Sequence, residues 1–78
     1  MRIQVECAPE HAGEAAPRRF YLGRNPVEVV DVIDRWPGHD HQYYKVQGDD
    51  GSIYILKHDT VEWVWNLTMF ASRDAWNR

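Results

Sequence analysis

The stretch that decides the fold is residues 42–58, QYYKVQGDDGSIYILKH, in the middle of the chain. Aromatic and β-branched residues lie on both sides of a cluster of Gly and Asp. Strands joined by a tight turn have this composition. The stretch therefore predicts a β-hairpin, and with it an all-β fold.

The turn of this hairpin can form in two ways. If Asp49 and Asp50 make a two-residue loop, both take a positive φ, which Asp tolerates less readily than an Asn-Gly pair would. If Asp49, Asp50 and Gly51 make a type I turn that ends in a left-handed glycine bulge, the positive φ falls on glycine, which has no Cβ. Turn chemistry favours the second arrangement.

The two turns predict different strand registers. The two-residue loop places His41 opposite His58. The longer turn, which we expect, pairs Gln42 with His58, Tyr44 with Leu56 and Val46 with Tyr54.

Four further segments have strand patterns: Met1 to Cys7, Arg18 to Leu22, Val27 to Trp36 and Val61 to Leu67. Alternation in the first places Ile3, Val5 and Cys7 on a buried face, with Cys7 as a small core residue. In the second, Phe20 and Leu22 alternate with Arg19 and Tyr21. In the last, one apolar face carries Val61, Trp63, Trp65 and Leu67.

Residues 27–36 cannot follow a single alternation. Val27 and Val29 point to one side, whereas Val30 and Val32, with Trp36, continue on the other. One extra residue near Val29 and Val30, a β-bulge, would switch the faces and bend the strand, as small barrels need. The alternative is a short helix that begins at Pro26, which the run of β-branched residues disfavours.

The remaining segments complete a single small β domain over residues 1–78. Residues 8–17 contain two Pro and one Gly without an apolar period, and we expect a mobile loop there. Residues 68–76 could form a short helix with Thr68 as its N-cap. The prediction is a strongly bent sheet or partly open SH3-like barrel of five to six strands with a short C-terminal helix. The order of the strands stays open.

The composition restricts the cellular location and the classes of partner that we expect. Cys7 is the single cysteine, no charged leader precedes an apolar run, and no segment approaches the ~20 apolar residues of a membrane span. We therefore expect a cytoplasmic protein with no membrane partner. The chain has 12 acidic and 9 basic side chains, and this balance argues against a protein that grips nucleic acid by its phosphates.

The sequence contains no recognisable catalytic constellation or cofactor motif, so we expect a non-enzymatic interaction module. Aromatic and cationic side chains that alternation leaves outside the core are the candidate binding residues: Arg19, Tyr21, Arg35, Trp36, Tyr43 and Lys45. Trp76 is a further aromatic of this kind. Aromatic and Arg side chains favour a protein partner or a second copy of the chain. The alternative function is single-stranded nucleic-acid binding by a local Arg and aromatic face.

A second group of polar residues could gather at the end of the hairpin remote from its turn: His39, Asp40, His41, His58 and Asp59. Imidazoles and carboxylates can hold zinc or a similar metal. The His-x-His spacing is permissive, however, and no cysteine pair accompanies it. Asp and His also serve ordinary turns, and we favour that surface role and expect no metal.

Residues scattered from Arg19 to Trp65 carry a family resemblance: Arg19-Phe20, Val29, Asp34-Arg35-Trp36, Tyr43-Tyr44-Lys45-Val46, Asp50-Gly51, Tyr54, Leu56, His58-Asp59 and Trp63. With these residues the chain resembles a family of small bacterial domains without assigned activity. The resemblance implies an occasional association with damage-tolerance polymerase proteins, and it supplies no catalytic residues.

Overall fold

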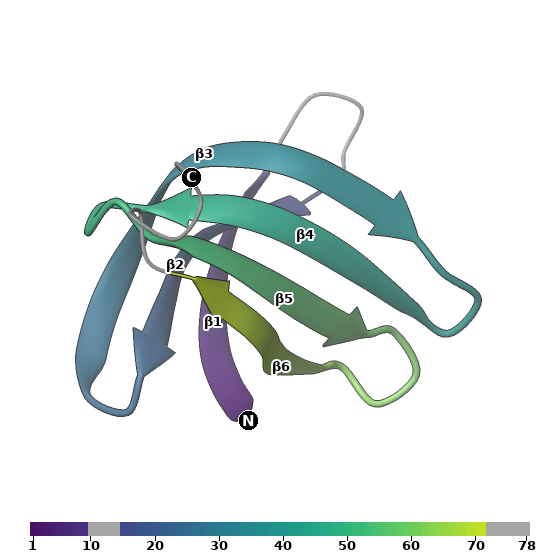
Figure 1. Cartoon of the computed structure of the whole chain (residues 1–78). Helices are drawn as coiled ribbons and strands as arrows, with labels where there is room; N and C mark the ends of the chain where they lie inside the picture. The colour runs from purple at the N-terminus through teal and green to yellow at the C-terminus, as the bar shows by residue number, and fades with distance from the viewer. Residues whose placement is uncertain (10–14, 72–78) are drawn as a thin grey trace.

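The computed structural model describes residues 1–9 and 15–71, which form six antiparallel strands (Figure 1). The strands are β1 (Arg2–Pro9), β2 (Ala15–Leu22), β3 (Asn25–Pro37), β4 (His41–Gly48), β5 (Ile53–Asp59) and β6 (Val64–Ala71). Each strand pairs with the next and β1 pairs with β6, so that the sheet closes into a barrel. The all-β class and the small barrel are confirmed. Within the described ranges, no helix is long and apolar enough to cross a membrane.

The barrel closes through two short seams. β1 and β6 share two residue pairs, Arg2 with Asn66 and Ile3 with Trp65. β2 and β3 share four pairs, from Arg19 with Glu28 to Leu22 with Asn25. Beyond each seam its two strands, β1 and β6 or β2 and β3, are no longer paired. Strands β3, β4 and β5 run side by side as one curved sheet, and β1 and β2 cross behind it (Figure 1).

The central hairpin has the register that turn chemistry favours. Gln42 lies opposite His58, Tyr44 opposite Leu56, and Val46 opposite Tyr54. The predicted turn over residues 49–51 is therefore confirmed. Gly51 has a φ of 83° and donates its N–H to the Gly48 carbonyl at 3.0 Å.

Asp50 connects this turn to the core. Its Oδ1 accepts the backbone N–H of Ser52 at 2.9 Å, and its Oδ2 accepts the hydroxyl of Tyr54 at 2.5 Å. The Tyr54 ring is buried, and burial, followed by the bond to Asp50, raises the pKa of its hydroxyl well above the usual range. The one polar atom of this core ring therefore keeps a partner, as a buried hydroxyl requires.

β3 contains two bulges. Its register against β4 shifts between Val29 and Asp31 and again between Val32 and Asp34. The first shift confirms the bulge predicted near Val29 and Val30, and it excludes a helix from Pro26. The second shift was not predicted. Because each bulge adds one residue, Val29 and Val32 both pack against the core.

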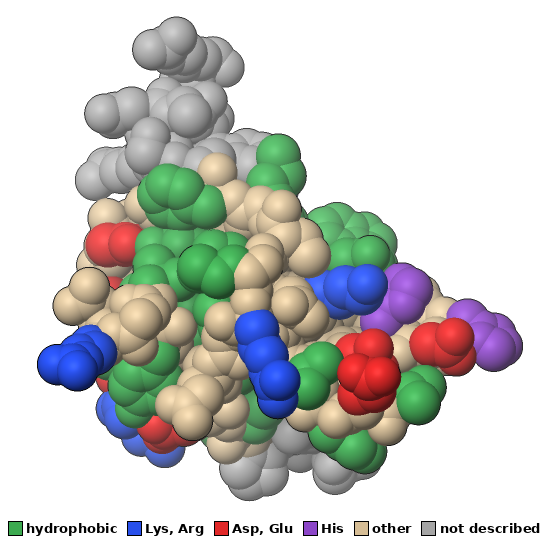
Figure 2. Space-filling model, turned by 90° about the horizontal axis from the view of Figure 1, so that it is seen from below, with side chains coloured by type: hydrophobic (Ala, Val, Ile, Leu, Met, Phe, Trp, Pro, Cys, Tyr) green, Lys and Arg blue, Asp and Glu red, His purple; other side chains and the backbone are tan. Residues whose placement is uncertain are grey.

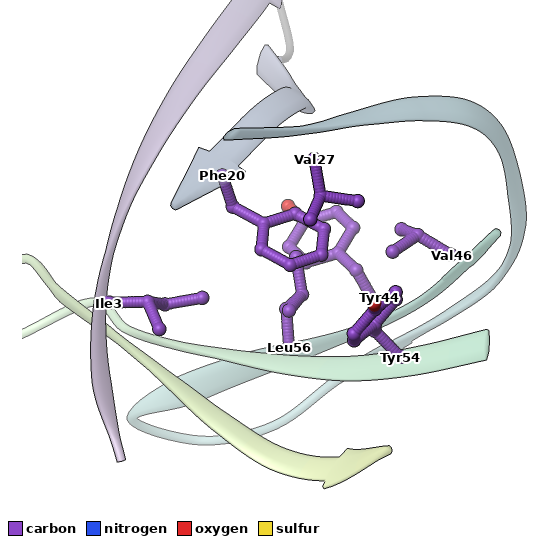
Figure 3. Close-up of a cluster of buried hydrophobic side chains, with 7 residues drawn as sticks. All are labelled: Ile3, Phe20, Val27, Tyr44, Val46, Tyr54 and Leu56. Carbon is purple, nitrogen blue, oxygen red and sulfur yellow. The ribbon is translucent and has the colours of Figure 1, made fainter. Parts of the chain in front are cut away.

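The core is a cluster of seven buried side chains drawn from five strands (Figure 3): Ile3, Phe20, Val27, Tyr44, Val46, Tyr54 and Leu56. Phe20 and Tyr54 meet edge to face with ring centroids 4.8 Å apart. Gly48 lets β4 approach this cluster, because a Cβ there would lie 2.6 Å from Cγ1 of Val27.

Two predictions near the amino end are wrong. Cys7 is exposed, because β1 pairs with β6 only at its start and the register against β2 shifts between Glu6 and Cys7. Neighbouring atoms nevertheless bury the sulfur in part, which raises the pKa of the thiol. The predicted loop 8–17 is shorter, since β1 extends to Pro9 and β2 begins at Ala15; its middle lies outside the described residues.

The last strand begins later than predicted. Residues 60–63 form a turn, so Val61 and Trp63 are exposed, while Trp65 and Leu67 pack against the core. The predicted helix from Thr68 is wrong for its first residues, because β6 continues to Ala71 and the Thr68 hydroxyl bonds the Ile55 carbonyl at 3.1 Å. The remainder of that helix, with Trp76, lies outside the described residues.

Two valines on neighbouring strands test the location of the core. Val46→Ala should lower the free energy of unfolding by about 2 kcal/mol, because it deletes fully buried methyl groups and leaves a cavity. Val30→Ala, at a site that is 59% exposed, should change it by less than about 0.5 kcal/mol. Urea unfolding of both variants measures the difference. Equal effects would contradict the assigned core.

Candidate functional site

Three of the predicted binding residues lie together on the outer face of β3 and β4. Trp36 is directly opposite Tyr43, and Lys45 is opposite Asp34. The ring of Tyr43 also meets His41 edge to face, with centroids 5.0 Å apart. The sequence prediction therefore brings Trp36, Tyr43 and Lys45 onto one surface.

Two exposed aliphatic residues extend this surface along β3. Val30 is 59% exposed, Ile33 44% and Trp36 43%. The spacing of three follows from the bulges, which turn Val29 and Val32 inward and leave Val30 and Ile33 outside. We call Val30, Ile33, Trp36, Tyr43 and Lys45 the β3 outer face. Sequence reasoning missed Val30 and Ile33 as surface residues, although the conflict of periods at Val30 was a signal.

Arg19 and Tyr21 lie elsewhere, on β2, and acidic partners engage both. Arg19 Nε donates to Glu28 Oε1, and its Nη1 lies 3.5 Å from Glu6 Oε1. The hydroxyl of Tyr21 donates to the other oxygen of Glu6 at 2.5 Å. The carboxylates of Glu6 and Glu28 offset the charge of Arg19, so this part of the sheet is not a basic face.

Arg35 is separated from its neighbour Trp36. It lies opposite Tyr44, whose side chain is buried, and its guanidinium carbon is 6.0 Å from the centroid of that ring. This distance is at the outer limit of a cation–π contact. Arg35 therefore lies on the opposite side of β3 from Trp36, at an exposed position.

The structure does not bring the histidines together. His41 pairs with Asp59, whereas His58 pairs with Gln42, and neighbouring residues of a strand point to opposite faces. His39 is exposed in the turn before β4, where its Nδ1 lies 2.8 Å from Asp40 Oδ1. In residues 1–9 and 15–71, no group of three or more His, Cys, Asp or Glu side chains could hold a metal ion.

His58 instead belongs to an aromatic cluster at the end of β5. Its ring stacks on Trp65 with centroids 4.2 Å apart and planes 6° from parallel, and Trp63 lies 5.2 Å away on the turn. Burial lowers the pKa of His58, and the nearby Asp59 carboxylate opposes this shift only in part.

Asp59 holds the turn that carries Trp63. Its Oδ1 accepts the backbone N–H groups of Val61 and Glu62, both at 2.9 Å. These bonds lower the pKa of Asp59. Trp63 has a φ of 59°, which is unusual for a bulky side chain. Asp59 therefore has the turn-forming role that was the favoured interpretation.

Charges of both signs lie among hydrophobic side chains on the face of the molecule seen from below, and no area of one sign covers it (Figure 2). This distribution agrees with the acidic overall balance. This face therefore presents apolar and aromatic groups for contact, and it does not present a continuous positive surface.

Comparisons with protein-family models, with curated proteins and with solved structures find no match. The resemblance to small bacterial domains therefore stays a prediction that depends on the residues quoted for it.

The stacked ring of His58 generates a pH-dependent prediction. Because its pKa is lowered in the fold, neutral His58 stabilises the protein above the ordinary value of 6.5, and this contribution is lost as the pH falls through the folded pKa. An NMR titration should show the His58 imidazole titrating below 6.5. Between pH 6.5 and the lowered folded pKa, the free energy of unfolding of His58→Gln should depend less on pH than that of the unmodified protein. Titration of His58 at or above 6.5 would contradict the buried stack.

Proposed function

We propose that this chain is a non-enzymatic interaction module that docks its β3 outer face onto a protein partner or onto a second copy of itself. The observation that carries the proposal is the row formed by Val30, Ile33 and Trp36 on the solvent side of one strand. Monomeric proteins scatter exposed apolar side chains singly, and a group of them on one strand is more typical of an interaction site.

The composition of the face supports a protein partner. Trp36 and Tyr43 are of the types that supply most of the binding energy at protein interfaces, where they fill pockets of the partner. Lys45 and Asp34 beside them give the row a polar rim, as protein interfaces have. Neither ring belongs to the cluster of buried residues that forms the core.

The alternative function, binding of single-stranded nucleic acid, would use the same Trp36, Tyr43 and Lys45. Stacking on aromatic rings accompanies a positive groove in such proteins. Acidic side chains accompany the cations here: Asp34 lies opposite Lys45, and Glu6 and Glu28 contact Arg19. These pairs favour the protein partner.

Site-specific photocrosslinking in cells that produce the protein tests the proposal. A photoreactive amino acid at Ile33 should give one discrete product, and the same group at Met69 should not. Met69 is a matched control, because it is also apolar and half exposed but lies on β6. Ile33→Glu should weaken the association of the captured pair at least tenfold, whereas Met69→Glu should not.

Equal products from Ile33 and Met69, or none from either, would contradict the proposal. The size of the product distinguishes a second copy from another protein. A binding assay with mixed single-stranded oligonucleotides at several salt concentrations tests the alternative function. If the protein binds nucleic acid, the logarithm of its affinity for the oligonucleotides should fall against the logarithm of the salt concentration, with a slope of about −0.7 for each phosphate contacted.

A further inference from the structure

Three pairs of residues lie opposite one another on the outer surface of β3 and β4. From the turn between the strands onward they are Trp36 with Tyr43, Asp34 with Lys45, and Asp31 with Gln47. The alternate residues of β4, Tyr44 and Val46, are buried, so these three pairs point outward. Each pair joins groups that attract one another: two aromatic rings, a carboxylate and an ammonium group, and a carboxylate and an amide.

A two-fold axis along the strands, midway between β3 and β4, exchanges the members of these pairs between two copies of the chain. Rotation about this axis keeps each residue at its level along the strands and lays β3 of one copy over β4 of the other. Two-fold dimers are the commonest symmetric assemblies, and sheets packed face to face keep their strand directions within about 30° of each other. The outer face can therefore meet a second copy with its strands nearly aligned.

In this arrangement each level of the face meets a complementary level. Trp36 lies over Tyr43 of the second copy, as aromatic anchors pair at interfaces. Asp34 lies over Lys45 of the second copy, and the symmetry forms this ion pair twice. Asp34 and Lys45 are also neighbours within one copy, so the four charges alternate in sign around the axis. One oxygen of Asp34 accepts the backbone N–H of Arg35 at 2.8 Å, and a carboxylate accepts further hydrogen bonds.

Other positions of the axis give a poorer match. An axis on β3 would place Asp34 over Asp34 of the second copy, and an axis on β4 would place Lys45 over Lys45. Like charges at such contacts repel. The exposed apolar residues Val30, Ile33 and Trp36 all lie on β3, so the covered area must include this strand. Charge and exposure together therefore fix the axis between β3 and β4.

We propose that the partner of the β3 outer face is a second copy of this chain, packed on it face to face by a two-fold axis between β3 and β4. The bulge residues Val30 and Ile33 are removed from water at the same interface. The covered area is only two strands wide, and small interfaces are typical of weak, reversible association. This inference names the partner of the proposed interaction module, and therefore rests on the proposed function.

Sedimentation equilibrium of the purified chain tests the inference. The unmodified protein should form a reversible dimer in the micromolar range. Asp34→Lys gives the dimer two contacts between ammonium groups, and Lys45→Asp gives it two contacts between carboxylates, so each variant alone should dimerise at least tenfold more weakly. An equimolar mixture of the two variants should recover dimerisation, because both contacts of the mixed dimer join opposite charges.

Two controls separate recognition from folding. Glu62→Lys makes the same change of charge as Asp34→Lys at an exposed position in the turn before β6, and should leave the dimer unchanged. In the unmodified protein, dilution should shift the NMR signals of the Trp36 indole and the Tyr43 ring and leave those of Met69 in place.

The inference is overturned by a protein that stays monomeric up to about 1 mM, or by a mixture that associates no better than its two components. The NMR spectrum of each charge variant verifies its fold. If a variant does not fold, the dilution experiment decides the question, and unchanged signals of Trp36 and Tyr43 would overturn the inference.

The outcomes for the dimer and for the proposed function can be separated. If Ile33 gives a crosslinked product with a different protein while the purified chain stays monomeric, the dimer is wrong and the interaction module stands. If the mixture of charge variants recovers dimerisation while Ile33 and Met69 crosslink alike in cells, the dimer stands and the proposed docking in cells is wrong.

Discussion

The structure depends on one constraint: β3 must run from its partner β2 to its partner β4 while keeping apolar side chains inside a very small barrel. Two bulges achieve this, because each extra residue bends the strand and resets which side chains face inward. Val29 and Val32 therefore line the core, and the intervening positions Val30 and Ile33 are left in solvent. The pairing of β3 with β2 ends at Glu28, just before the first bulge. The exposed residues of the outer face are thus a consequence of the bulges.

The other candidate residues, outside the β3 outer face, take part in ion pairs or in aromatic packing within the chain. Glu6 and Glu28 engage Arg19 on the β1–β3 side of the barrel, and the rings of Trp63 and Trp65 engage His58 at the far end of the hairpin. These candidates have partners within the chain. Val30, Ile33 and Trp36 are exposed on β3, and we therefore propose this strand, and not the arginine of β2 or the histidines, as the recognition surface.

Local chemistry made much of the fold predictable. The hairpin register follows from which residue accepts a positive φ, and Gly51 is that residue. The first bulge follows from two valine sets that cannot share one alternation. The second bulge has no such signal, since Ile33 continues an apolar run whichever way it faces.

Cys7 and Trp63 are misplaced by the sequence prediction, because alternation predicts the face on which a side chain lies but not whether another strand covers that face. The correct register also separates His41 from His58, since Gln42 lies opposite His58 and the two histidines then point to opposite faces.

The most direct test of this account is the pattern of backbone nuclear Overhauser contacts between β3 and β4. The two bulges predict contacts of Val29 with Gly48, Val32 with Val46 and Arg35 with Tyr44. A strand without bulges, starting from the same first pair, would instead place Val32 opposite Lys45 and Arg35 opposite Gln42. Observation of that uninterrupted ladder would put Val32 outside the core and would contradict the outer face.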